Sequence, residues 1–228
     1  MAVAPLLSVI IPVYNGAEFL ADALTSVYAQ AYTPIEIIVV DDGSADNTAA
    51  VVQMCGPDIR YLYQSNQGPA AARNAGLALA QGELIAFLDA DDLWPPHKLT
   101  LQVTALLANE KVQVVWGHTQ ICTYGETVAP CRTLAPQRAP LLGSLLCRRS
   151  VFTQVGLFDP ALWLGEDIDW LRRLVAAGVV VQSSPDLALL YRMRPGSLTY
   201  GRQPQDLGWF AIARLALQQR RAAEVGGM

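Results

Sequence analysis

GELIAFLDADDLW, residues 82–94, joins an apolar run to three aspartates, Asp89, Asp91 and Asp92. The run ELIAFL has the length and composition of a buried strand. Three like charges at the end of such a strand repel one another unless a cation or a hydrogen-bonding partner compensates them. The stretch therefore predicts a buried strand that carries its carboxylates to a site where something binds, although a solvated turn is the alternative.

Similar apolar runs occur on both sides of this stretch, and most are followed by a segment at helical spacing. Strands that are apolar throughout and alternate with helices are typical of a mostly parallel sheet covered by helices on both faces. The predicted fold class is therefore α/β. The expected strands cover residues 6–13, 35–42, 59–64, 83–90, 112–118, 144–149, 179–184 and 187–194. The expected helices cover residues 17–30, 46–55, 68–81, 95–109, 150–159, 166–178 and 206–225.

Composition and charge exclude several classes of protein. The chain has 228 residues, of which 52% are hydrophobic and 16% charged, as in a compact globular protein. Its net charge of −4 argues against a nucleic-acid partner, which normally requires a basic face. No apolar run is long enough to span a membrane, and no basic segment precedes the apolar N-terminal stretch as in a signal peptide. We therefore expect a cytoplasmic location.

Histidine and cysteine are scarce and scattered. His97 and His118 are the only histidines, which excludes a multi-histidine metal site and disfavours a histidine-centred catalytic triad. The four cysteines form no CxxC pair, so we expect reduced and partly buried thiols. Chemistry in this chain must then depend on carboxylates and arginines, alone or with a metal ion.

We expect one domain over residues 1–228, built from two halves. The first half covers about residues 1–118 and the second about 119–204, followed by a C-terminal helix over 205–228. Between 121 and 140 the periodicity gives way to Gly, Pro, Thr and Arg. A long irregular stretch inside a compact domain is usually a functional loop or lid.

Polar side chains follow three of the expected strands. Asn15 follows the first, Asp41 and Asp42 end the second, and the DADD aspartates follow the fourth. In open α/β sheets ligands bind beyond the carboxyl ends of the strands, so these groups should meet in one crevice. The sequence has neither GxGxxG nor a Walker A loop to hold phosphate. Closely spaced carboxylates instead suit Mg²⁺ or Mn²⁺, which can bridge to diphosphate oxygens.

Four motifs in this order resemble the family 2 glycosyltransferases, which have the GT-A fold. They are SVIIPVYNG, IIVVDDGSADNT, NQGPAAARNAGLALAQGELIAFLDADDLW and LGEDIDWLRRLVAAG. The resemblance covers about residues 6–195 and implies a Rossmann-like nucleotide-binding half joined to an acceptor half. It also implies roles for individual residues.

On the donor side, the resemblance implies that Pro12, Val13, Tyr14 and Asn15 belong to the nucleoside pocket. Asp42, with Asp41 beside it, matches the aspartate that accepts a hydrogen bond from the base. A carboxylate suits an N–H edge such as that of uracil or thymine, and the expected donor is a UDP-sugar. The alternative role for the two aspartates is turn formation and helix capping.

The resemblance places Arg73 and Asn74 near the nucleotide or its diphosphate, where a planar guanidinium fork suits phosphate. A solvated helical arginine is the alternative. Asp89 and Asp91 match the metal-binding motif, with Asp91 the direct ligand. Asp92 is left to bind sugar hydroxyls or to cap the next turn.

In the acceptor half, GEDIDW matches the Glu-Asp pair at the start of a helix. The resemblance makes Asp167, beside Glu166, the general base that deprotonates the acceptor hydroxyl. Attack opposite the leaving diphosphate then inverts the anomeric configuration. Helix-dipole complementarity is the alternative reason for acidic residues in a first helical turn. Trp163 is a candidate to stack on an acceptor sugar, or else a packed loop residue.

One position departs from the family pattern. Many relatives carry a histidine that helps bind metal or diphosphate where this chain has Arg194, in YRMRPGSLT. Arginine cannot ligate a metal but can pair with phosphate oxygens. The departure leaves three readings: fewer protein ligands to the metal, supplementary charge from Arg194, or weakened activity.

The resemblance predicts a metal-dependent, inverting transferase that moves one sugar from a UDP-sugar to a saccharide or lipid-linked acceptor, in cell-surface polysaccharide or glycoconjugate synthesis. The C-terminal segment leaves packing on the core, homodimerisation and peripheral contact with a membrane open. The alternatives are a non-catalytic nucleotide-sugar-binding or scaffolding module and, with less support, a sugar nucleotidyltransferase.

Overall fold

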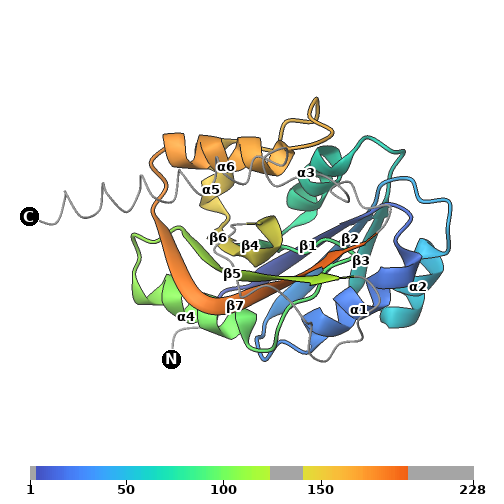
Figure 1. Ribbon diagram of the computed structural model, residues 1–228, viewed down its shortest axis with the longest axis horizontal. Helices are drawn as coiled ribbons and strands as arrows, with labels where there is room; N and C mark the ends of the chain where they lie inside the picture. The colour runs from blue at the N-terminus through green and yellow to red at the C-terminus, as the bar shows by residue number, and fades with distance from the viewer. Residues whose placement is uncertain (1–3, 124–140, 195–228) are drawn as a thin grey trace, which may run out of the picture.

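A seven-stranded sheet forms the centre of the protein in a computed structural model that describes residues 4–123 and 141–194 (Figure 1). The strands are β1 (Leu7–Val13), β2 (Ile35–Asp41), β3 (Ile59–Tyr63), β4 (Leu84–Phe87), β5 (Val114–Thr123), β6 (Leu145–Arg148) and β7 (Val181–Met193). The helices are α1 (Ala17–Tyr28), α2 (Thr48–Cys55), α3 (Pro69–Leu79), α4 (Lys98–Ala108), α5 (Ser150–Val155) and α6 (Glu166–Ala176), with a 3₁₀ turn at Leu142–Ser144.

The strand order is β3-β2-β1-β4-β6-β5-β7. β1 pairs in parallel with β2 and β4, β2 with β3, and β5 with β7, whereas β6 runs antiparallel to both of its neighbours. This confirms the predicted α/β class with a mostly parallel sheet. The chain order reverses direction beside β1, so the carboxyl ends of β1 and β4 border the crevice where such sheets bind ligands.

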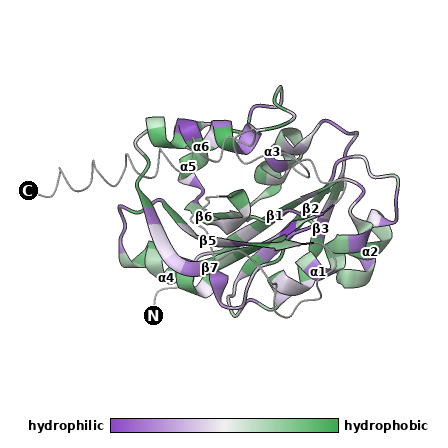
Figure 2. Cartoon of the chain, viewed as in Figure 1, coloured by the Kyte–Doolittle hydropathy of each residue, from purple (hydrophilic) through white to green (hydrophobic). Residues whose placement is uncertain are grey.

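Helices cover both faces of the sheet, as predicted (Figure 1). Successive residues of β1 enter different cores, because Val9 and Ile11 pack with α1 and α4 whereas Ile10 packs with α3 and α6. A strand that is buried on both faces needs apolar residues at every position. That requirement explains why the central strands are hydrophobic along their length (Figure 2).

The last part of the sheet differs from the prediction. The two strands expected at 179–184 and 187–194 form one strand, β7. Its pairing with β5 shifts register between Trp116 and Thr119, which accommodates Pro185 in an irregular stretch. β7 is an edge strand, where a proline and a bulge are tolerated because one side of the ladder is free.

Some predictions concern residues outside the described part of the chain. The C-terminal helix over 205–228 and most of the loop over 121–140 fall there. Cys122 is disulfide-bonded, which corrects the expectation that all four thiols are reduced, whereas Cys55 and Cys147 are free. Over residues 4–123 and 141–194, none of the helices is both long and apolar enough to cross a membrane.

Candidate active site

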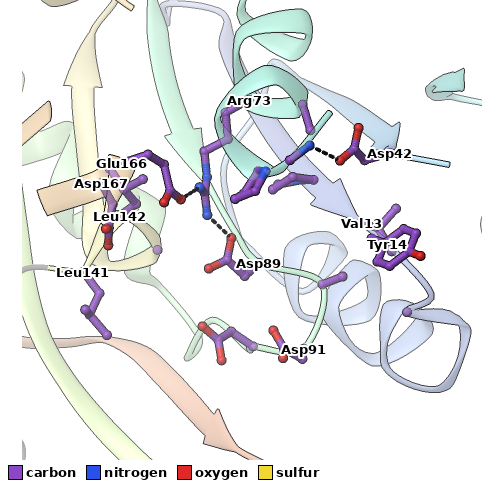
Figure 3. A pocket seen from close by; sticks show the side chains of 18 of the residues that line it. Val13, Tyr14, Asp42, Arg73, Asp89, Asp91, Leu141, Leu142, Glu166 and Asp167 are labelled. Carbon is purple, nitrogen blue, oxygen red and sulfur yellow. Dashed lines mark hydrogen bonds and ion pairs between the residues drawn. The ribbon is translucent and has the colours of Figure 1, made fainter. Parts of the chain in front are cut away.

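A cavity of about 660 Å³ opens at the carboxyl ends of β1 and β4, between the first turns of α3 and α6 (Figure 3). It brings together most of the residues that the sequence singled out. These are Pro12, Val13, Tyr14, Asp42, Arg73, Asp89, Asp91, Trp163, Glu166, Asp167 and Arg194. Asn15, Asp41 and Asn74 do not line it.

Asp42 is buried at the end of β2, and backbone and side-chain amides surround its carboxylate. Oδ1 accepts hydrogen bonds from the Gln67 amide (3.0 Å) and from Gln64 Nε2 (2.7 Å). Oδ2 accepts one from the Gly68 amide at 2.8 Å. A carboxylate has about four acceptor sites, so Asp42 retains one for a ligand after these three bonds. Its position is therefore set before a ligand arrives.

Asp41 and Asn15 hold the loops around the cavity. Asp41 accepts hydrogen bonds from the Ser44 amide and from the Tyr61 hydroxyl, at 2.8 and 2.7 Å. The Asn15 side chain accepts one from the Ala45 amide at 2.8 Å. Asn15 thus joins the loops after β1 and β2, whereas Asp41 joins the loop after β2 to β3, and neither side chain lines the cavity.

Arg73 links the two halves of the site. One end of its buried guanidinium pairs with Glu166 and the other with Asp89, at 2.7 Å for Asp89 (Figure 3). Burial lowers the pKa of the guanidinium, but the two carboxylates raise it by more, so Arg73 stays charged. Its Nε is buried without a partner among the described residues. Arg73 therefore fixes the end of β4 against the start of α6.

Asn74, the neighbour of Arg73, faces the opposite way. Its side-chain amide donates to the Phe158 carbonyl at 2.8 Å and accepts from the Phe158 amide at 3.1 Å. This two-bond contact fastens the loop before α6 to α3. Asn74 thereby supports the loop that carries Trp163.

The DADD turn is held by the end of β7. Arg194 Nε donates to Asp91 Oδ2 at 2.9 Å, and the Arg192 amide donates to Asp92 Oδ1 at 2.9 Å. Burial and the neighbouring carboxylates raise the pKa of Asp91, and they raise that of Asp92 well above its usual range. The repulsion between the DADD carboxylates that the sequence predicts is thus offset by the Arg194 side chain and the Arg192 amide.

Asp167 lies in the first turn of α6 with its carboxylate near the cavity (Figure 3). Burial and the adjacent Glu166 raise its pKa to about 6, while Arg73 and the Ile168 amide oppose that rise. A carboxylate with such a pKa is ionised at neutral pH and still basic enough to accept a proton. Asp167 therefore has the properties of a general base.

Trp163 is 59% exposed, yet its ring lies against Gly68 at the start of α3. A Cβ at position 68 would approach that ring to 3.5 Å, and the backbone there has φ of +89°, a conformation that favours glycine. Gly68 also donates the amide hydrogen bond to Asp42. The loop between α5 and α6 thus reaches the start of α3 at the cavity.

Comparison with known proteins agrees with this geometry. The family model described as Glycosyl transferase family 2 matches residues 8–165, more than half of the chain. The chain belongs to glycosyl transferase family 2.

Two curated relatives of this family 2 chain are uncharacterised glycosyltransferases. The one from Nostoc sp. is 38% identical over 177 residues, which are 69% of this chain and 55% of that protein. The one from Rickettsia prowazekii is 37% identical over 186 residues, 74% of this chain and 58% of that protein. The chain thus spans somewhat more than half the length of these relatives.

Solved structures share the fold of this family 2 chain. S. aureus TarS 1–349 in complex with UDP aligns with a TM-score of 0.67 at 21% identity, covering 92% of this chain and 63% of that one. The mannosyltransferase PcManGT from Pyrobaculum calidifontis, in complex with GDP-Man and Mn²⁺, aligns with a TM-score of 0.62 at 23% identity, covering 81% and 56%. The fold is therefore the GT-A fold.

One wall of the family 2 cavity was missed by the sequence interpretation. Leu141, Leu142 and Gly143 line it on the side of Asp167. Three side chains spaced by four residues each donate to the main chain next to this wall. They are Trp94 Nε1 to the Gly143 carbonyl (2.9 Å), Gln102 Nε2 to Ser144 (2.8 Å) and Lys98 Nζ to Leu145 (3.0 Å). Lys98 and Gln102, two polar residues one turn apart on the buried face of α4, were the available signal.

The donor set of the site suits a hard divalent cation. Within residues 4–123 and 141–194, no group of three or more His, Cys, Asp and Glu side chains is arranged to hold a metal alone. Mg²⁺ and Mn²⁺ are nevertheless commonly bound by one or two carboxylates plus substrate phosphates. Asp89 and Asp91 both line the cavity and provide such oxygen ligands.

Proposed function

We propose that this family 2 chain transfers a sugar from a nucleoside diphosphate sugar to a hydroxyl of an acceptor, with inversion and with the help of a divalent metal. One observation carries the proposal. Asp42, Asp89, Asp91 and Asp167 line a single cavity, and the pKa of Asp167 is about 6. We assign Asp42 to the base of the nucleotide and Asp89 and Asp91 to the metal.

The proposed donor is a UDP-sugar. The remaining acceptor site of Asp42 suits the N3–H of uracil, and Tyr14, 54% exposed at the cavity edge, offers a ring face to the base. The TarS structures with UDP and UDP-GlcNAc support this choice. PcManGT was solved with GDP-Man, so guanosine is the competing nucleotide to be tested.

Asp89 and Asp91 would hold the metal, which when bound neutralises charge on the departing diphosphate. Arg73 fixes Asp89 and Glu166, so the metal side and the base side of the cavity keep a set separation. Preorganised charge of this kind is usually the largest electrostatic contribution to such reactions.

Asp167 is the proposed general base. As the acceptor oxygen forms its bond to the anomeric carbon, its proton passes to the Asp167 carboxylate, and the bond from that carbon to the diphosphate oxygen breaks. Attack from the face opposite the diphosphate inverts the configuration. Glu166 is occupied by Arg73 and acts by positioning.

The acceptor is proposed to be a saccharide or a lipid-linked sugar, and the setting to be synthesis of a cell-surface polysaccharide or glycoconjugate on the cytoplasmic side of the membrane. Leu141, Leu142 and Trp163 give the acceptor side apolar surface that suits sugar rings or an aglycone. We further propose that residues 1–118 and 119–204 act as nucleotide and acceptor halves of one domain.

A non-catalytic binding module is the second candidate, because Arg194 pairs with Asp91 where many relatives have a histidine. Two experiments distinguish the transferase from the non-catalytic module. The first is calorimetric titration with UDP, GDP, dTDP and CDP, each with Mn²⁺ and again with EDTA, and the second is a turnover assay with the sugar donor of the nucleotide that binds. We expect Mn²⁺-dependent binding of UDP, weakened in Asp91→Asn and unchanged in Asp58→Asn, an exposed aspartate that does not line the cavity. Lack of binding by all four nucleotides would reject the proposal.

A further inference from the structure

Arg194 lies between an aromatic ring and a carboxylate at the edge of the cavity. Its guanidinium carbon is 4.5 Å from the centroid of the Phe19 ring, and its Nε donates to Asp91 Oδ2 at 2.9 Å. All three residues line the cavity. Among the described residues, the two terminal nitrogens of Arg194 make no hydrogen bond within the protein. An arginine has five N–H donors, of which the described residues engage only the one on Nε of Arg194.

Arg192, two residues earlier on β7, differs from Arg194 because its hydrogen bonds give it a structural role. Its Nε donates to the Asp91 carbonyl, Nη1 pairs with Asp22 at 2.9 Å and Nη2 donates to the Phe19 carbonyl at 3.4 Å. Arg192 does not line the cavity. Each of its nitrogens has a protein partner, so Arg192 holds the DADD turn, whereas Arg194 occupies only one oxygen of a carboxylate.

The Arg194 contact conflicts with a metal at the same carboxylate. Asp91 Oδ2 is engaged by a guanidinium, which has no lone pair to share with a cation. A divalent cation placed nearby would also be repelled by the fixed positive charge. Diphosphate oxygens remove this conflict, because their negative charge pairs with the guanidinium fork and also neutralises the metal.

We propose that Arg194 exchanges partners during donor binding: it pairs with Asp91 in the ligand-free protein and moves to the diphosphate when the metal binds Asp91. The metal alone then binds weakly, because it must displace Arg194 without compensation. The nucleotide then binds more tightly to the metal-loaded protein than to the metal-free protein. The metal binds more tightly to the nucleotide-loaded protein by the same factor. This inference rests on the proposed function, because it assumes a metal and a diphosphate in this cavity.

The test is calorimetric titration of Mn²⁺ alone, of UDP alone and of UDP in saturating Mn²⁺, for the wild type and for Arg194→Met. Methionine keeps the packing on Phe19 and removes the charge. We expect Arg194→Met to bind Mn²⁺ alone about tenfold more tightly, and UDP with Mn²⁺ about tenfold more weakly, within the usual range of coupling between sites. These opposite changes are the signature, since a structural defect would weaken both.

Two variants make the result specific. Arg194→Lys keeps the charge near Asp91, so it should show no gain in Mn²⁺ affinity, yet lose part of the UDP affinity because it lacks the fork. Arg60→Met removes an arginine from a carboxylate pair with Glu36 outside the cavity and should change neither affinity.

Equal Mn²⁺ affinity in Arg194→Met and the wild type, including undetectable binding in both, would overturn the exchange. So would equal UDP affinity of the wild type in Mn²⁺ and in EDTA, which would make Arg194 a permanent replacement for the metal. Failure of the proposed function looks different. In that case no nucleotide binds under any condition, whereas the Mn²⁺ titration still reports on the Arg194–Asp91 pair.

Discussion

Asp42 and Asp167 are carboxylates on opposite sides of one cavity, and their surroundings differ. Asp42, after β2, accepts three hydrogen bonds from the segment between β3 and α3. Asp167, at the start of α6, accepts one from the Ile168 amide and has a pKa raised to about 6 by burial and by Glu166. Several hydrogen-bond donors around a carboxylate fix it in place to recognise a ligand, whereas a carboxylate with few such donors remains able to accept a proton.

The largest effect is expected from Asp167→Asn, which removes the proton acceptor and keeps the shape of the site. Loss of a general base typically costs 10²–10⁴-fold in rate, so we expect a fall of about that size in kcat/KM with unchanged UDP affinity. Steady-state kinetics and calorimetry measure the two quantities. Asp169→Asn, in the same helical turn and paired with Arg173, is the control and should keep most activity. Full activity of Asp167→Asn would show that another residue is the general base.

Asp42→Asn should act on binding. The new amide N–H₂ would face donors from Gln64, Gln67 and Gly68, leaving at least one of them unsatisfied at a cost of about 1–3 kcal/mol. We expect the Kd for UDP to rise by roughly ten- to a hundredfold, and kcat at saturating donor to change little. Circular dichroism checks the fold, and a variant that lost kcat with normal UDP affinity would contradict the contrast between the two carboxylates.

The pH profile should report Asp167. A base must be unprotonated to act, so kcat/KM should fall about tenfold per pH unit below a pKa of about 6. Arg73 opposes the rise of that pKa, so Arg73→Gln should move the acid limb to higher pH, by about one unit or more. Arg60→Gln, outside the cavity, should leave the limb in place. An unmoved limb in Arg73→Gln would show that Arg73 does not act on the base.

The smallest effect is expected from Lys98→Met. Lys98 is buried against Trp94, with Nζ 3.9 Å from the ring centroid, and its hydrogen bond to the Leu145 carbonyl supports the wall at 141–143. Loss of one hydrogen bond is worth about 1 kcal/mol, so we expect the acceptor KM to rise up to about fivefold at unchanged UDP affinity. Lys111→Met, at an exposed lysine, is the control. A change in UDP affinity alone would reject this role.

The fold and the meeting of Asp42 with Asp91 in one cavity were predictable because they depend on local patterns. Apolar runs placed the strands, and polar residues at strand ends placed Asp42 and Asp91 in one crevice. The exception in the sheet was β7, for which two strands were expected on either side of Pro185, although an edge strand with a bulge tolerates a proline.

Long-range contacts were not predictable, because no spacing in the sequence encodes them. Arg73 was expected near the diphosphate, and its two carboxylate partners lie 16 and 93 residues away in the chain. Asn74 and Asn15 match family motifs, but their side chains bond to backbone outside the cavity. The contact of Arg194 with Asp91 likewise joins residues 103 positions apart.

Release of UDP from UDP-GlcNAc and other UDP-sugars, measured with Mn²⁺ and with EDTA, tests the central claim most directly. Water serves as the acceptor in this assay, so the natural acceptor need not be known. We predict Mn²⁺-dependent release by the wild type that is nearly lost in Asp91→Asn and strongly reduced in Asp167→Asn. Release that persists in both variants, or in EDTA, would contradict the assignment of this cavity as a metal-dependent transferase site.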